Sequence, residues 1–142
     1  MHDADLLSQF EACTLPGDLW THRAHVRVAY LYLSSCPFED AIGKLRVGIK
    51  RYNASRGVEE SATSGYNETT TIAFAHIVAA TIAGYGSAFP VSNSDEFCDT
   101  HPQLMSPKVL RLYYSPERRM HPDAKTRFVE PDLSPLPKIG SS

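Results

Sequence analysis

The chain has 142 residues, of which 42% are hydrophobic and 21% are charged, and its formal net charge is −2. This length and balance predict one domain with a buried core, and they exclude the clustered Lys and Arg of a nucleic-acid-binding surface. The acidic start at residues 1–5 is unlike a signal peptide, and the longest apolar stretch, residues 72–83, is too short to cross a bilayer. We therefore expect a cytoplasmic protein without nucleic-acid or membrane partners, and a homodimer is left open.

Apolar residues at helical spacing predict the secondary structure in chain order. Proline and glycine residues, among them Pro16, Gly17, Pro37 and Gly84, separate the segments. The second segment is apolar on nearly all sides, which is typical of a central helix. The expected helices cover residues 5–13, 21–35, 37–55, 67–83, 94–100 and 107–114, and a last helix begins at Ser115 and is interrupted at Pro122.

The order of these segments predicts the fold class. The sequence has no alternating strand series, no internal repeat and no Gly-rich phosphate loop. About six helices joined by short loops predict an all-α compact bundle over residues 1–133. Residues 134–142 contain Pro135 and Pro137, so we expect an extended or disordered tail there.

Two histidines open the second helix. His22 and His25 stand three residues apart, which places both imidazoles on one face. A pair of imidazoles can bind a metal or transfer protons near neutral pH. The alternative is an ordinary helix start with two partly exposed histidines.

A single carboxylate enters the fourth helix. Glu68 is followed by no other charged residue before Asp95. In the structural interpretation Asn67 caps this helix and Glu68 complements the helix dipole. In the functional interpretation Glu68 meets His22 and His25 as a metal-binding set of two histidines and one carboxylate, or as a metal-free acid–base site.

Further residues are candidates for the wall of such a site. We expect Tyr32, Tyr66 and Tyr113 to line a substrate pocket, Asn67 to hydrogen-bond a ligand and His76 to flank the same cavity. Each of them has an alternative structural role, as a cap or as a packed core residue. The remaining histidines, His2, His101 and His121, are expected to be solvated.

The motifs together resemble those of a widespread group of small uncharacterised helical bacterial proteins. The resemblance rests on His22-x-x-His25, on residues 65–71, on Tyr113-Tyr114-Ser115 and on residues 128–133, in that order. The group typically has a Tyr-His-Glu-Thr pattern, whereas this chain has Asn67 at the histidine position. The resemblance implies a helical fold and these candidate sites, but no activity. If the group binds a metal through three histidines, this chain lacks one of them.

The leading hypothesis is a small-molecule enzyme. It uses His22, His25 and Glu68 for acid–base chemistry, such as isomerisation, cyclisation, elimination or hydrolysis, on an apolar or aromatic substrate. One alternative is a non-catalytic module that binds a small molecule or a protein. The other is a metal-dependent oxygenase or hydrolase with His22, His25 and Glu68 as ligands. The cofactor is therefore open, with a divalent metal as the candidate, and the sequence does not identify the substrate.

Overall fold

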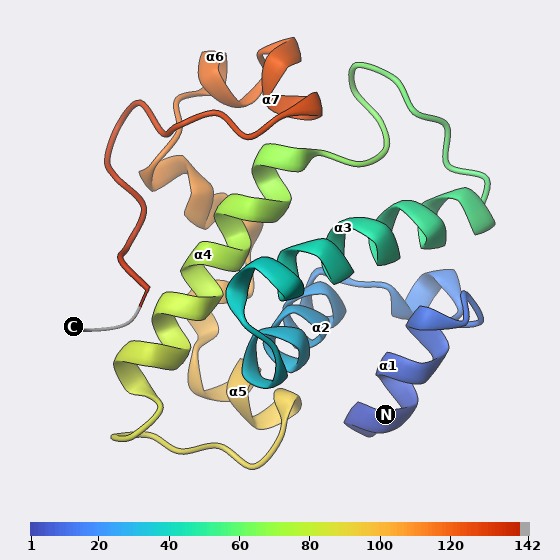
Figure 1. The fold of residues 1–142 in the computed structure, drawn as a ribbon, viewed down its shortest axis with the longest axis vertical. Coiled ribbons are helices and arrows are strands. Elements are labelled where there is room, and N and C mark those ends of the chain that lie inside the picture. The colour runs from blue at the N-terminus through green and yellow to red at the C-terminus, as the bar shows by residue number, and fades with distance from the viewer. Residues whose placement is uncertain (140–142) are drawn as a thin grey trace.

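The structure is a computed structural model that describes residues 1–139. Every regular element in these residues is a helix, so the predicted all-α class is confirmed (Figure 1). Between α3 and α4 a single isolated bridge joins Ser61 and Ser64. The α-helices are α1 (Asp3–Glu11), α2 (His22–Ser35), α3 (Phe38–Ser55), α4 (Glu68–Tyr85), α5 (Ser94–Thr100), α6 (Pro116–Arg119) and α7 (Pro122–Thr126). Three 3-10 helices are η1 (Gly17–Leu19), η2 (Pro102–Leu104) and η3 (Pro107–Leu112).

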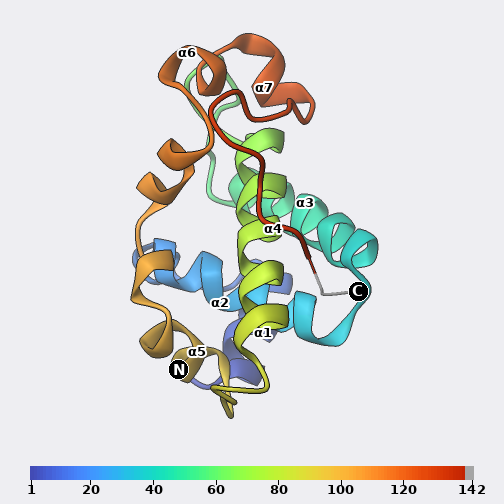
Figure 2. The same ribbon diagram turned by 90° about the vertical axis from the view of Figure 1, so that its left-hand side faces the viewer.

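Helices α2 and α4 are central to the fold. In Figure 2, α4 stands upright and α2 crosses it. Helix α2 contacts α1, α3, α4 and α5, and α4 also contacts α3, α7 and η3. The buried side chains form two clusters, and α2 contributes Val28 to the first and Val26 to the second. The apolar surface of α2 is therefore covered on both sides, as its sequence predicts.

Side-chain caps explain where the central helices begin. The Thr21 hydroxyl accepts a hydrogen bond from the Ala24 amide at 3.2 Å, and α2 starts at the next residue after Thr21. The Asn67 side chain accepts one from the Thr70 amide at 2.9 Å and caps α4. Each cap satisfies an amide that the first turn of a helix leaves without a partner. Asn67 therefore caps α4, as the structural interpretation of this residue predicts.

The predicted interruption of the last helix at Pro122 is confirmed, because Pro122 stands in the first turn of a separate helix, α7. The structure differs from the predictions at two other places. Residues 107–114, predicted as an α-helix, begin with the 3-10 helix η3. His101, expected to be solvated, is 5% exposed, and its ring packs on that of Phe97 with 4.8 Å between centroids. Its position directly after α5 turns it into the core.

Residues 127–139 form no helix, and they run beside α4 (Figure 2). They are attached to the body of the protein: the Tyr114 hydroxyl donates to the Val129 carbonyl at 2.8 Å, and Leu136 packs against the second cluster. The predicted tail, residues 134–142, begins in this segment, and residues 140–142 lie outside the described residues. Within residues 1–139, no helix is both long enough and apolar enough to cross a membrane.

A glycine allows α3 to lie close against α1. A β-carbon at Gly48 would come within 2.7 Å of the Phe10 ring. That ring is fully buried and stacks on Trp20 at 4.7 Å, so it has little room to move. We expect Gly48→Ala to lower the free energy of unfolding, because overpacking costs about 1–3 kcal/mol and the gain in helix propensity is about 1 kcal/mol.

The control is Gly43→Ala in the same helix, where a β-carbon would meet nothing within 4 Å. This substitution should raise the free energy of unfolding by up to about 1 kcal/mol. Urea unfolding followed by circular dichroism measures both variants. Equal stabilisation by the two substitutions would contradict the close packing of α1 on α3.

Candidate functional site

His22 and His25 form one wall of an apolar pocket between α2, α3 and α4. Together with Ala29 they occupy positions i, i+3 and i+7 of α2, which lie on the side of the helix that faces the pocket. The pocket has a volume of about 310 Å³. We call it the histidine pocket. Its other lining residues are Trp20, Leu45, Ile49, Thr70, Thr71, Phe74, Ala75 and Pro107.

Backbone carbonyls hold both imidazoles. The Nδ1 atom of His25 lies 2.8 Å from the Thr21 carbonyl oxygen, and the Nε2 atom of His22 lies 2.8 Å from the Leu104 carbonyl oxygen. A carbonyl oxygen can only accept, so each of these nitrogens carries a proton and donates. In the neutral tautomer the other nitrogen of each ring then has a free lone pair. Within residues 1–139, neither of these second nitrogens has a hydrogen-bond partner.

His25 is partly shielded from water by an aromatic neighbour. Its ring stacks on Trp20 with 3.8 Å between ring centroids. Burial lowers the pKa of His25 below its usual value, the charge of His22 lowers it further, and the hydrogen bond to Thr21 acts in the opposite direction. His25 is therefore an uncharged base at neutral pH. The His22 ring meets the edge of Phe74 at 5.1 Å.

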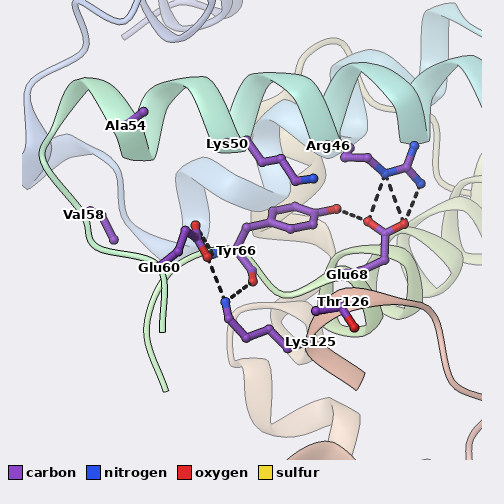
Figure 3. Close-up of a pocket in the computed structure, with 9 residues that line it drawn as sticks. All are labelled: Arg46, Lys50, Ala54, Val58, Glu60, Tyr66, Glu68, Lys125 and Thr126. Atoms are coloured by element: carbon purple, nitrogen blue, oxygen red, sulfur yellow. Dashed lines mark hydrogen bonds and ion pairs between the residues drawn. The ribbon is translucent and has the colours of Figure 1, made fainter. Parts of the chain in front are cut away.

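Glu68 is not part of the histidine pocket. Its two oxygens accept from Arg46 Nε at 3.0 and 3.1 Å, Arg46 Nη2 donates at 2.7 Å, and the Tyr66 hydroxyl donates at 2.6 Å (Figure 3). The Arg46 guanidinium holds the pKa of Glu68 below its usual value. The predicted group of His22, His25 and Glu68 is thus not assembled. Across residues 1–139, no three His, Cys, Asp or Glu side chains are grouped to hold a metal ion.

The physical reason is the pair of partners that bind the Glu68 carboxylate. Although Glu68 stands three residues before Thr71 on the same side of α4, the Arg46 guanidinium of α3 and the Tyr66 hydroxyl bind its oxygens outside the histidine pocket. The isolated carboxylate of α4 does have a charged partner, but that partner comes from α3. Sequence spacing within one helix could not identify it.

Glu68 and Tyr66 instead line a second, polar pocket, which we call the basic groove (Figure 3). It lies between α3, the loop of residues 56–67 and α7, and its volume is about 650 Å³. Burial, with the nearby Glu68 carboxylate, raises the pKa of Tyr66, so its hydroxyl stays protonated and donates. The lining residues are Arg46, Lys50, Ala54, Val58, Glu60, Tyr66, Glu68, Lys125 and Thr126.

The remaining predicted wall residues lie elsewhere. Tyr32 is 3% exposed and donates to Glu11 at 2.7 Å. Tyr113 packs beside the second core cluster. His76 packs on the Phe38 ring at 4.7 Å, and its buried Nδ1 has no hydrogen-bond partner in residues 1–139. None of these three side chains lines the histidine pocket of the described chain.

Several residues of the histidine pocket were missed by the sequence analysis. Trp20 lies two positions before His22, and Leu45 and Ile49 stand four residues apart on α3. Their spacing indicates a buried face, but it does not show which helix that face meets. Phe74, a neighbour of the predicted His76, lines the pocket in its place.

Comparisons with models of protein families, with curated proteins and with solved structures give no match. The resemblance to small helical bacterial proteins therefore remains an expectation.

Removing the charge of Glu68 should destabilise the fold. We expect Glu68→Gln to lower the free energy of unfolding by about 1–2 kcal/mol, since charge-assisted hydrogen bonds are lost but the site is partly screened by water. Glu68 is 14% exposed and Arg46 is 37% exposed. The pKa of Glu68 is lowered on folding, so its contribution is complete above about pH 4.5 and declines as pH falls below it.

Thermal and urea unfolding of both proteins between acid and neutral pH would measure this loss. The control is Asp123→Asn, which removes an exposed carboxylate that pairs with Arg127 and lies 3.8 Å from His121, and it should change stability by less than about 0.5 kcal/mol. A Glu68→Gln protein as stable as the control at neutral pH would show that the Arg46 pair does not hold α3 to α4.

The protonation of His25 should be visible in the fluorescence of Trp20, the only tryptophan of the chain. An imidazolium stacked on an indole accepts an electron from its excited state, so protonation should quench the emission. We expect a transition with a midpoint below pH 6.5, because the pKa of His25 is lowered. Folding should also lose stability as pH falls from 6.5 through the folded-state pKa, since the unfolded chain binds the proton more readily.

A pH titration of the fluorescence, with His25→Gln as the control, tests this expectation. The variant should lose the transition, because glutamine does not titrate. A midpoint above pH 6.5 in the unmodified protein would contradict the lowered pKa of His25.

Proposed function

We propose that the chain is a small-molecule enzyme that carries out proton-transfer chemistry in the histidine pocket. The observation that carries the proposal is the pair of imidazoles, each fixed by a backbone carbonyl on one nitrogen and unpartnered on the other. Imidazoles oriented in this way are typical of general bases. Compared with the sequence-based hypothesis, Glu68 has no catalytic role here.

The pocket supports a small, apolar substrate. Its volume, about 310 Å³, is roughly twice the ~150 Å³ cavity that holds one benzene ring. Aliphatic and aromatic side chains form most of its wall, and Thr70 and Thr71 add two hydroxyl-bearing side chains. Such a mixture of apolar wall and few polar groups is typical of small-molecule sites. We therefore propose a substrate with one or two rings.

His25 is the proposed base. It is uncharged at neutral pH because burial lowers its pKa, so its lone pair can take a proton from a bound substrate or from water. The resulting imidazolium can return the proton to another atom, which completes an isomerisation, or it can lose the proton to solvent after an elimination. In hydrolysis the same lone pair would activate a water molecule. His22 is the proposed second acceptor.

A probe reaction tests the base directly. The ring opening of nitrobenzisoxazole starts with the removal of one carbon-bound proton, and its nitrophenolate product is coloured. We expect the protein to accelerate this reaction, with a rate that rises with pH through the lowered pKa of His25. His25→Ala should reduce the acceleration by about 100-fold, the lower range for one general base.

The control is His2→Ala, which removes an exposed histidine outside the pocket. Its rate should equal that of the unmodified protein. Equal rates in His25→Ala and His2→Ala would overturn the proposed base. Quenching of Trp20 by the probe without any acceleration would favour the alternative, a non-catalytic binding module.

A cytoplasmic location is part of the same proposal. All three cysteines, Cys13, Cys36 and Cys98, are free thiols. Unpaired thiols fit a reducing compartment.

A further inference from the structure

The basic groove is separate from the histidine pocket, and its charges are unequally paired. Arg46, Lys50 and Lys125 bring three positive charges to it, and Glu60 and Glu68 bring two negative charges. Glu68 already forms an ion pair with Arg46. The groove thus holds one more cation than carboxylate, which favours the binding of an anion.

Lys50 is the cation without a carboxylate partner. Its Nζ atom lies over the Tyr66 ring, 5.0 Å from the ring centroid (Figure 3). Within the described chain, it makes no ion pair and no hydrogen bond to a carboxylate. Its positive charge contributes to lowering the pKa of both Glu60 and Glu68 across the groove.

Glu60 shows how a carboxylate sits in this groove. Its two oxygens lie 3.0 and 3.2 Å from the Tyr66 amide nitrogen, which donates, and Lys125 Nζ donates at 2.9 Å. Lys125 is itself 17% exposed and fixed by the Tyr66 carbonyl. At Gly65, whose φ is +94°, an added β-carbon would overlap the Glu60 carboxylate. A backbone amide, an ammonium group and the missing side chain of a glycine together form a cradle of carboxylate size.

The carboxylate in this cradle is easily replaced. Glu60 belongs to the loop of residues 56–67, and its side chain is 56% exposed. Water reaches the Glu60 carboxylate and screens its pair with the largely buried Lys125 ammonium, so a carboxylate from solution can compete with it. The Arg46 and Glu68 pair, by contrast, is built into the contact between α3 and α4 and stays in place.

We propose that the cradle formed by Gly65, Tyr66 and Lys125 is a binding site for the carboxylate of a small organic acid, which Glu60 occupies as an internal competitor. Binding exchanges one carboxylate for another on the Tyr66 amide and the Lys125 ammonium. The released Glu60 side chain turns into solvent, and Lys50 attracts the incoming anion. The site does not depend on the chemistry proposed for the histidine pocket.

Acetate is the probe, and the nuclear magnetic resonance signal of the Tyr66 amide is the readout. In Glu60→Ala the cradle is vacant, so acetate should shift this signal saturably, while sodium chloride of equal ionic strength should not. The unmodified protein should bind acetate roughly three- to tenfold more weakly, because a tethered competitor acts at millimolar effective concentration. Adding Lys125→Met to Glu60→Ala should abolish the shift.

The matched control is Glu59→Ala, which removes the neighbouring exposed carboxylate of the same loop and should behave as the unmodified protein. Equal shifts with acetate and chloride would overturn the site. Tighter binding of inorganic phosphate than of acetate would overturn the assignment to carboxylates. A Glu60→Ala protein without a folded spectrum would also overturn it, because Glu60 would then be structural rather than replaceable.

Discussion

The fold depends on the burial of α2. Val26 and Val28 are 1% and 0% exposed although they point to different sides of the helix. A helix with apolar residues on so many sides is stable in water only when other elements cover all of them. Helices α1 and α3 cover the side of Val28, α5 covers the side of Val26, and α4 contributes residues to both clusters. The arrangement of the whole bundle follows from this requirement.

The burial of α2 also encloses a charged side chain, which needs hydrogen-bond and ion-pair partners. Arg27, between the two valines, is 8% exposed. Its guanidinium donates to Ser94 at 2.7 Å, to Asp3 at 3.1 Å and to the Met1 carbonyl at 2.7 Å. A buried guanidinium without such partners would be strongly destabilising. Arg27 thereby joins the N-terminal residues to the start of α5, and the Ser94 amide also donates directly to the Asp3 carboxylate at 3.0 Å.

Neighbouring stripes on one helix supply the two pockets. On α3, Leu45 and Ile49 line the histidine pocket, while Arg46 and Lys50 line the basic groove. Because adjacent residues differ by about 100° around a helix, the two stripes face different directions. The histidine pocket and the basic groove can thus both adjoin α3 without sharing a side chain.

Local signals predicted much of the fold. Thr21 and Pro37 mark the limits of the second helix, and Asn67 marks the start of α4 despite the β-branched residues that follow. The pairing of His22 and His25 in one pocket was also readable from their spacing. The partner of Glu68 was not, since Arg46 is 22 positions away and the choice depends on how α3 crosses α4. The place of Tyr66 in the basic groove has the same non-local origin, because the Lys125 that binds its carbonyl is 59 positions away.

A row of three rings links the start of the chain to the proposed base. Phe10 of α1 stacks on Trp20, and Trp20 stacks on His25. Helix α1 is held at its beginning by the bonds from Arg27 to Met1 and Asp3. A substitution at Asp3 would release the start of α1, and a shift of Phe10 would pass through Trp20 to the imidazole. The environment of His25 is therefore sensitive to changes in a helix that does not line the histidine pocket.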